Sequence, residues 1–112
     1  MLPVKNFTDR FSLSLHRAVA EKMLTNEDGV LRIARENLDR WLKSPSFAKR
    51  GRRALLEWKG ILDEFEPERI RRIITADSDE GQRLRSSSPF AGVLTEEERR
   101  NYFIACGKIG SF

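Results

Sequence analysis

Apolar residues recur every three or four positions along most of this chain, which is the spacing of one face of an α-helix. The longest regular stripe lies between positions 54 and 65, and its members are Ala54, Leu55, Trp58, Ile61, Leu62 and Phe65. Shorter stripes of the same period cover residues 11–23 and 31–42. No stretch alternates apolar and polar residues for long enough to form a strand. The pattern therefore predicts an all-α protein.

Turn and capping residues divide this pattern into separate helices. The sequence TNEDG at 25–29 ends the first stripe, and SPS at 44–46 ends the second. Pro67 suits the first turn of a fourth helix, because proline lacks the N–H group that this position leaves unpaired. A short helix is then predicted from about Ser78 to Arg85, where acidic residues stand near the positive end of the helix dipole.

The last predicted helix begins at Thr95. In the sequence TEEE, Glu98 stands three residues after this threonine, which is the spacing of a capping box. Gly107 suits the C-terminal end, because glycine readily adopts the left-handed conformation that often ends a helix. The 112 residues are thus predicted to form one domain, 1–112, folded as a single compact bundle of five or six short helices.

Composition narrows the class of protein further. The chain is 39% hydrophobic and 34% charged, with a net charge of +4, so one modest core and a solvated, mixed-charge surface are expected. A single cysteine excludes an internal disulfide, which favours a reducing, cytoplasmic setting. No apolar run approaches the roughly 18 to 20 residues of a membrane span, and the first residues lack a signal-peptide pattern. We therefore expect a cytoplasmic protein that is not associated with a membrane.

Residues with catalytic potential are few. His16 is the only histidine and Cys106 the only cysteine, so a Cys/His pair for nucleophilic catalysis is one interpretation. The alternative is that Cys106 is a small core residue and His16 lies on a helix surface, and this is the interpretation we expect to hold. The chain has no glycine-rich phosphate loop and no repeated Cys/His spacing of a zinc site. The sequence thus predicts no enzyme, no metal and no cofactor.

The sequence KRGRR at 49–53 is the one dense basic cluster. Lys49, Arg50, Arg52 and Arg53 fall at the predicted start of the third helix, where cations oppose the positive end of the helix dipole. That placement favours an anion-docking site, since free N–H groups and basic side chains would both face a phosphate or an acidic partner. The alternative is a solvated run of charges with no ligand.

The stretch SSSPFAGVL at 86–94 places apolar residues in a predicted loop. Pro89 excludes the preceding serine from the helical region, so the helix before it must end there. The stretch is either a buried corner between helices or an exposed apolar knob that binds a partner. We predict that Val93 and Leu94 anchor it to the core while Phe90 lies at or near the surface, and we assign Phe90 and Val93 to the partner-binding site.

Four segments carry a resemblance to a known family. LHRAVAEKM, ARENLDRWL, ALLEWKGIL and RLRSSSPFAGVLTEEERRNYF, in this order, resemble a family of small, uncharacterised bacterial proteins with an LRxSSPFAGVL-type motif. Members of this family are associated with toxin–antitoxin-type gene neighbourhoods. The resemblance covers roughly residues 14–103 and brings no activity that could be assigned to particular residues. It implies a compact helical protein with an antitoxin-like or regulatory role.

Two classes of function remain. The first is a non-catalytic protein-interaction or regulatory module that binds a partner protein. The alternative is a small helical nucleic-acid-binding protein that contacts the phosphate backbone through its basic cluster. Glu57, Lys59 and Asp63 on the outer face of the third helix make a mixed surface that suits the major groove poorly. Trp41 and Trp58 stand at the centres of apolar stripes, which favours packing in one shared core over stacking on bases. The protein partner is therefore the favoured prediction.

Overall fold

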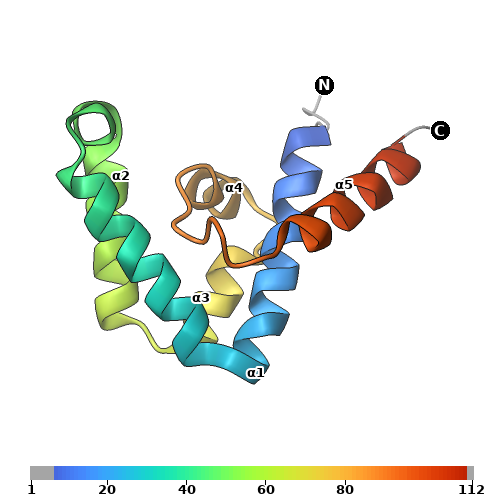
Figure 1. Ribbon diagram of the computed structural model, residues 1–112, viewed down its shortest axis with the longest axis horizontal. Helices are drawn as coiled ribbons and strands as arrows, with labels where there is room; N and C mark the ends of the chain where they lie inside the picture. The colour runs from blue at the N-terminus through green and yellow to red at the C-terminus, as the bar shows by residue number, and fades with distance from the viewer. Residues whose placement is uncertain (1–6, 111–112) are drawn as a thin grey trace.

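The protein is an all-α bundle, as predicted (Figure 1). The computed structural model describes the backbone of residues 7–110 and the side chains of residues 8–46 and 51–104. Within the described backbone there are five helices and no strand: α1 (Phe7–Lys43), α2 (Pro45–Glu64), α3 (Pro67–Ile74), α4 (Asp79–Arg85) and α5 (Glu96–Gly110). None of these helices, over the residues described, is both long enough and apolar enough to cross a membrane.

The long helix α1 is bent at Asn26 into two arms, residues 7–25 and 27–43, which form a V in Figure 1. The backbone leaves helical geometry at Asn26 (φ −146°, ψ 58°), and the Asn26 Oδ1 accepts a hydrogen bond of 3.3 Å from the Gly29 N–H. This bond caps the second arm as an N-cap residue caps a new helix. A Cβ on Gly29 would lie 2.5 Å from the Asn26 side chain, so any larger residue there would displace this side chain from its capping position. The two helices that were predicted on either side of residues 25–29 are thus the two arms of one bent helix.

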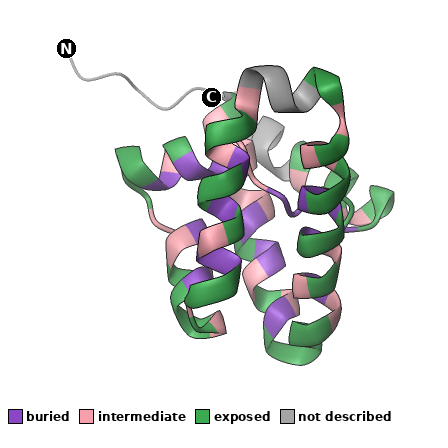
Figure 2. Cartoon of the chain, turned by 90° about the vertical axis from the view of Figure 1, so that its left-hand side faces the viewer, coloured by how far each residue is buried: buried purple, intermediate pink, exposed green. Residues whose placement is uncertain are grey.

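The core lies inside the V. Helix α2 runs beside the second arm, and α3, α4 and the connection to α5 occupy the space between the arms (Figure 1). Buried positions face this interior and exposed positions line the outside (Figure 2). Trp58 is fully buried in the core, as predicted, whereas Trp41 is only half-buried and packs against the core from its edge.

The predicted start of α4 near Ser78 and the predicted capping box at Thr95 are confirmed. Ser78 also caps α4, because its Oγ accepts a hydrogen bond of 3.0 Å from the Gly81 N–H. At α5 the Thr95 N–H donates to the Glu98 Oε1 (2.8 Å), and the Glu98 N–H donates to the Thr95 Oγ1 (3.1 Å), which is a complete capping box. The predicted stop of α5 at Gly107 is wrong, because the helix continues to Gly110.

Candidate functional site

The connection between α4 and α5, residues 86–95, is bound to both arms of α1; we call it the 86–95 loop. On the first arm, the Lys22 Nζ donates to the Val93 carbonyl at 3.1 Å. On the second arm, the Asn37 Nδ2 donates to the carbonyl oxygens of Pro89 and Ala91, both at 2.8 Å. Because these bonds reach both sides of the V, the loop fixes the angle between the arms.

Phe90 is buried, so the prediction that it lies at the surface is wrong. Its side chain is 5% exposed, and its ring makes edge-on contacts with Trp58 (centroids 5.7 Å apart) and with His16 (6.3 Å). Val93 is also buried, at 6% exposed, which confirms its role as an anchor. Phe90 and Val93, the two side chains assigned to partner binding, are therefore both buried and do not form a docking surface.

The turn that places Phe90 depends on Gly92. The Val93 N–H donates to the Phe90 carbonyl at 3.3 Å, and Gly92, one residue before the donor, has φ +84°. A positive φ at this position is the signature of a type II turn, which glycine adopts without strain. The Phe90 N–H donates in turn to the Ser88 Oγ at 3.2 Å. These two bonds hold the ring toward the core.

His16 is buried and hydrogen-bonded at both ring nitrogens, so its expected place on a helix surface is also wrong. The Nδ1 lies 2.7 Å from the Ser12 carbonyl oxygen, and the Nε2 lies 2.7 Å from the Ser88 Oγ. Because a carbonyl only accepts, Nδ1 carries the proton of the neutral ring, and the Ser88 hydroxyl donates to Nε2. Burial is the main reason that the pKa of His16 falls from 6.5 to about 4; the hydrogen bond to Ser12 opposes the fall and the positive charge of Arg85 contributes to it. The ring is therefore neutral near pH 7.

Arg85 is a buried cation that sequence reasoning did not single out. It is 5% exposed, and its Nη1 donates to the carbonyl oxygens of Ile74 (3.3 Å) and Ala76 (2.7 Å), where α3 ends. Its Nε is buried and has no hydrogen-bond partner, and none of the carboxylates in the described part of the chain forms an ion pair with it. Burial lowers the pKa of Arg85, and the charge of Arg17 adds to this, while Asp9 opposes it. The positive charge of Arg85 is thus incompletely compensated.

A cavity of about 310 Å³ lies between the first arm of α1, the 86–95 loop and the start of α5. Its polar wall consists of His16, Arg85, Ser88 and Arg99. Its apolar wall includes Leu15, Val19, Phe90 and Leu94. The cavity therefore combines two guanidinium groups with an apolar lining, in the size range of roughly 300–1,000 Å³ that small-molecule sites occupy.

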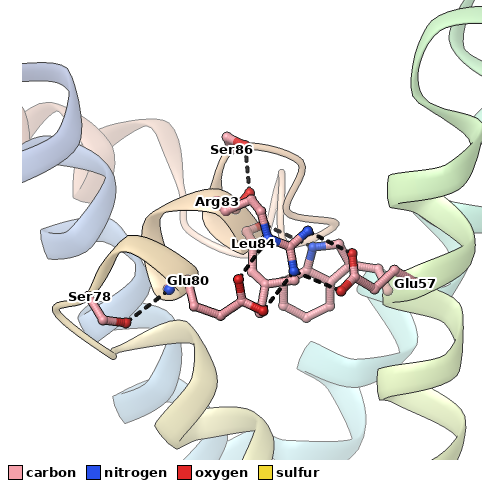
Figure 3. Close-up of polar contacts among 8 residues, drawn as sticks. Glu57, Ser78, Glu80, Arg83, Leu84 and Ser86 are labelled. Carbon is pink, nitrogen blue, oxygen red and sulfur yellow. Dashed lines mark hydrogen bonds and ion pairs between the residues drawn. The ribbon is translucent and has the colours of Figure 1, made fainter.

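Helix α4 holds Arg85 in place through contacts with α2 (Figure 3). Arg83 forms a two-pronged ion pair with Glu57, with both N–O distances 2.9 Å, and also bonds Glu80 on its own helix. A second bond joins the two helices, because the Trp58 Nε1–H donates to the Leu84 carbonyl at 2.9 Å. The hydrogen bonds from Arg83 lower the pKa of both Glu57 and Glu80. These bonds fix the helix whose last residue is Arg85.

The basic cluster spans a kink inside α2. Helix α2 begins at Pro45, earlier than predicted, but its backbone leaves helical geometry at Gly51 (φ −124°, ψ 16°), where two helical segments are joined. Arg52 and Arg53 therefore stand at the start of the second segment, as predicted, whereas Lys49 and Arg50 belong to the first. The side chains of Lys49 and Arg50 lie outside the described residues. Arg52 and Arg53 are exposed, and the backbone departs from helical geometry at Gly51 just before them. The exposed pair leaves both the anion-docking and the solvated interpretation open.

Large apolar side chains are exposed at four described positions. Leu24 is 68% exposed, Leu56 45%, Phe103 51% and Ile104 46%. Phe103 and Ile104 are neighbours on α5, and the Phe103 ring packs edge-on against Phe11 of α1, with centroids 5.3 Å apart. The two residues make the edge where α5 crosses the first arm, and we call this the α5 edge. Among the four described exposed apolar residues, Phe103 and Ile104 are the two that are consecutive in sequence.

The remaining catalytic candidate, Cys106, lies outside the described side chains. Over the residues that are described, no three His, Cys, Asp or Glu side chains are grouped so that they could hold a metal ion. No family model, no curated protein and no solved structure matches the chain. The resemblance to the small bacterial proteins with an LRxSSPFAGVL-type motif stays a prediction.

Proposed function

We propose that the protein is a non-catalytic interaction module that binds a partner protein, in an antitoxin-like or regulatory role, and that the partner docks on the α5 edge. The observation that carries this proposal is the exposure of Phe103 and Ile104 side by side on one helix. Contiguous exposed apolar residues on a small soluble protein are typical of an interaction surface. The α5 edge replaces the 86–95 loop as the docking site because Phe90 is buried.

The surroundings of the α5 edge suit a protein interface. The preceding turns of α5 carry exposed charges of both signs, Glu96, Glu97, Arg99 and Arg100. An apolar centre with a charged rim is the usual anatomy of such an interface. The capping box at Thr95 and the ion pair between Lys22 and Glu98 (3.0 Å) hold the start of α5 against α1. A rigid helix presents its anchor side chains at little entropic cost, which favours binding.

Site-specific photo-crosslinking tests this proposal. The photoreactive residue p-benzoylphenylalanine is placed at position 104 in the full chain, within cells that produce the protein from its own promoter. The matched control carries the same residue at position 56, because Leu56 is as exposed as Ile104 (45% and 46%) but lies on α2. We expect one protein to be crosslinked from position 104 and not from position 56.

The outcome is decisive in both directions. A single crosslinked partner that appears at position 104 alone supports the α5 edge as the docking surface. No crosslinked protein from position 104, or the same products from both positions, contradicts it.

A further inference from the structure

The cavity beside the 86–95 loop contains a buried positive charge that the described carboxylates leave without an ion pair. Arg85 is 95% buried, counted from its 5% exposure, and its Nε donates to nothing. A buried donor without an acceptor is destabilising, and more so when it is charged. The two hydrogen bonds of Arg85, both from Nη1, go to carbonyl oxygens at the end of α3, which explains its position but does not neutralise it. The Nε lies too deep for a ligand to contact it, but an anion bound in the cavity would compensate the positive charge of the guanidinium.

We infer that this cavity is the binding site of a small organic carboxylate, whose charged end pairs with Arg85 and Arg99 and whose apolar body lies against Leu15, Val19 and Phe90. The inference does not depend on the α5 edge or on any protein partner.

The lining of the cavity favours a carboxylate over phosphate. The guanidinium of Arg99 has planar N–H donors that match the two oxygens of a carboxylate. Arg85, whose Nη1 already donates to backbone carbonyls, adds positive charge beside it. His16 is neutral, and the proton of Ser88 is committed to it, so this side of the wall adds no further charge. A doubly charged phosphate would leave several oxygens against Val19, Leu94 and Phe90, where burying an unpaired charge is costly. One delocalised negative charge with an apolar tail fits the wall that is present.

Two further cavities do not have this property. In a cavity of about 130 Å³ between α1 and α2, Arg35 is already paired with Asp63 at 2.7 Å. A groove of about 250 Å³ between α1 and α3 is lined by Arg17, Arg71 and Arg72, but Glu21 and Glu68 share its wall. Only at Arg85, in the described part of the chain, does a cavity wall include a buried arginine without an ion pair.

The test is a titration of the ¹⁵N-labelled full chain followed by ¹H–¹⁵N NMR. The probes are hexanoate and benzoate, with hexanamide and benzamide as uncharged counterparts of the same shape. We expect the acids to shift the amides of Gly92 and Val19 and the Nε–H resonance of Arg85, which a spectrum of Arg85→Lys assigns. The amides should bind at least tenfold more weakly, because a charge-assisted hydrogen bond contributes about 1.5–3 kcal/mol.

Matched variants connect the binding to the cavity without disturbing buried residues. Arg99→Gln removes a cation from the cavity wall, whereas Arg100→Gln removes the next residue of α5, which lies outside the wall. We expect Arg99→Gln to weaken acid binding about tenfold and Arg100→Gln to leave it within twofold. Equal binding of acids and amides, equal effects of the two variants, or no shift at Arg85 with millimolar acid overturns the inference.

Discussion

The buried, neutral His16 makes stability depend on pH in a way that can be measured at one residue. In the folded protein burial lowers its pKa to about 4, whereas in the unfolded chain the pKa returns to 6.5. As the pH falls through 6.5, the unfolded chain binds a proton that the folded protein does not take up until about pH 4. The unfolded state is thereby favoured, so stability decreases as the pH falls across this window.

The size of the effect follows from the shift. A difference of one pKa unit corresponds to about 1.4 kcal/mol, so the free energy of unfolding should fall by about 2 kcal/mol between pH 7 and pH 5 and by about 3 kcal/mol at pH 4. This is a large share of the stability of a small domain. Carboxylates with lowered pKa values, such as Glu57 and Glu98, add a loss of their own at acidic pH. A variant without the histidine separates the two contributions.

Urea unfolding of untagged wild type and His16→Gln between pH 4 and pH 7.5 measures the difference. Both proteins share the carboxylates, so the extra loss in the wild type belongs to His16. Because His16 is the only histidine, its Cε1–H resonance reports the folded-state pKa without an assignment problem. A titration midpoint near 6.5, or equal pH dependence in the two proteins, would refute the burial and the lowered pKa derived for this residue.

Three further predictions concern the core, the turn and the basic pair. Phe90→Ala and Trp58→Ala should each lower the free energy of unfolding by about 3–5 kcal/mol, measured by urea unfolding. A change below about 1 kcal/mol for Phe90→Ala would show that this ring is exposed and not part of the core. Gly92→Ala should cost about 1–2 kcal/mol because φ is +84° there, and an unchanged midpoint would contradict the turn assigned. If the basic pair contacts DNA phosphates, the affinity for a short duplex falls with salt. The double change Arg52→Gln with Arg53→Gln should then make the plot of log affinity against log salt less steep by about two. An unchanged slope excludes this pair from phosphate contact.

The sequence predicts the helices well because local signals determine them. The capping box at Thr95, the Ser78 start of α4 and the proline at the start of α3 act within one turn, and the structure has all three. The sequence also predicts the break at 25–29, but it does not predict that this break is a bend within one helix. Whether helices on either side of a break stay joined depends on what packs between the arms, and that is a property of the whole fold.

The candidate site was harder to predict because long-range contacts build it. Ser88 and His16 are 72 residues apart in sequence, and Asn37 is 52 residues from Pro89. The sequence does contain one signal of the site: His16 and Asn37 are polar residues that adjoin apolar positions of a helical stripe, beside Leu15 and Leu38. A polar residue that is buried there needs a hydrogen-bond partner, and a loop packed against the helix can supply one. Phe90 was misplaced because a proline and a glycine fix a bend without fixing the direction in which its apex points.

The most direct test of the proposed function is the affinity of the protein that crosslinks from position 104, measured with the purified full chain. Ile104→Ser and Leu56→Ser remove equally exposed side chains from α5 and α2. We predict that Ile104→Ser raises the Kd roughly 30-fold, as expected for an anchor residue that contributes about 2 kcal/mol, and that Leu56→Ser changes it less than twofold. A partner that binds Ile104→Ser as tightly as the wild type would contradict docking on the α5 edge.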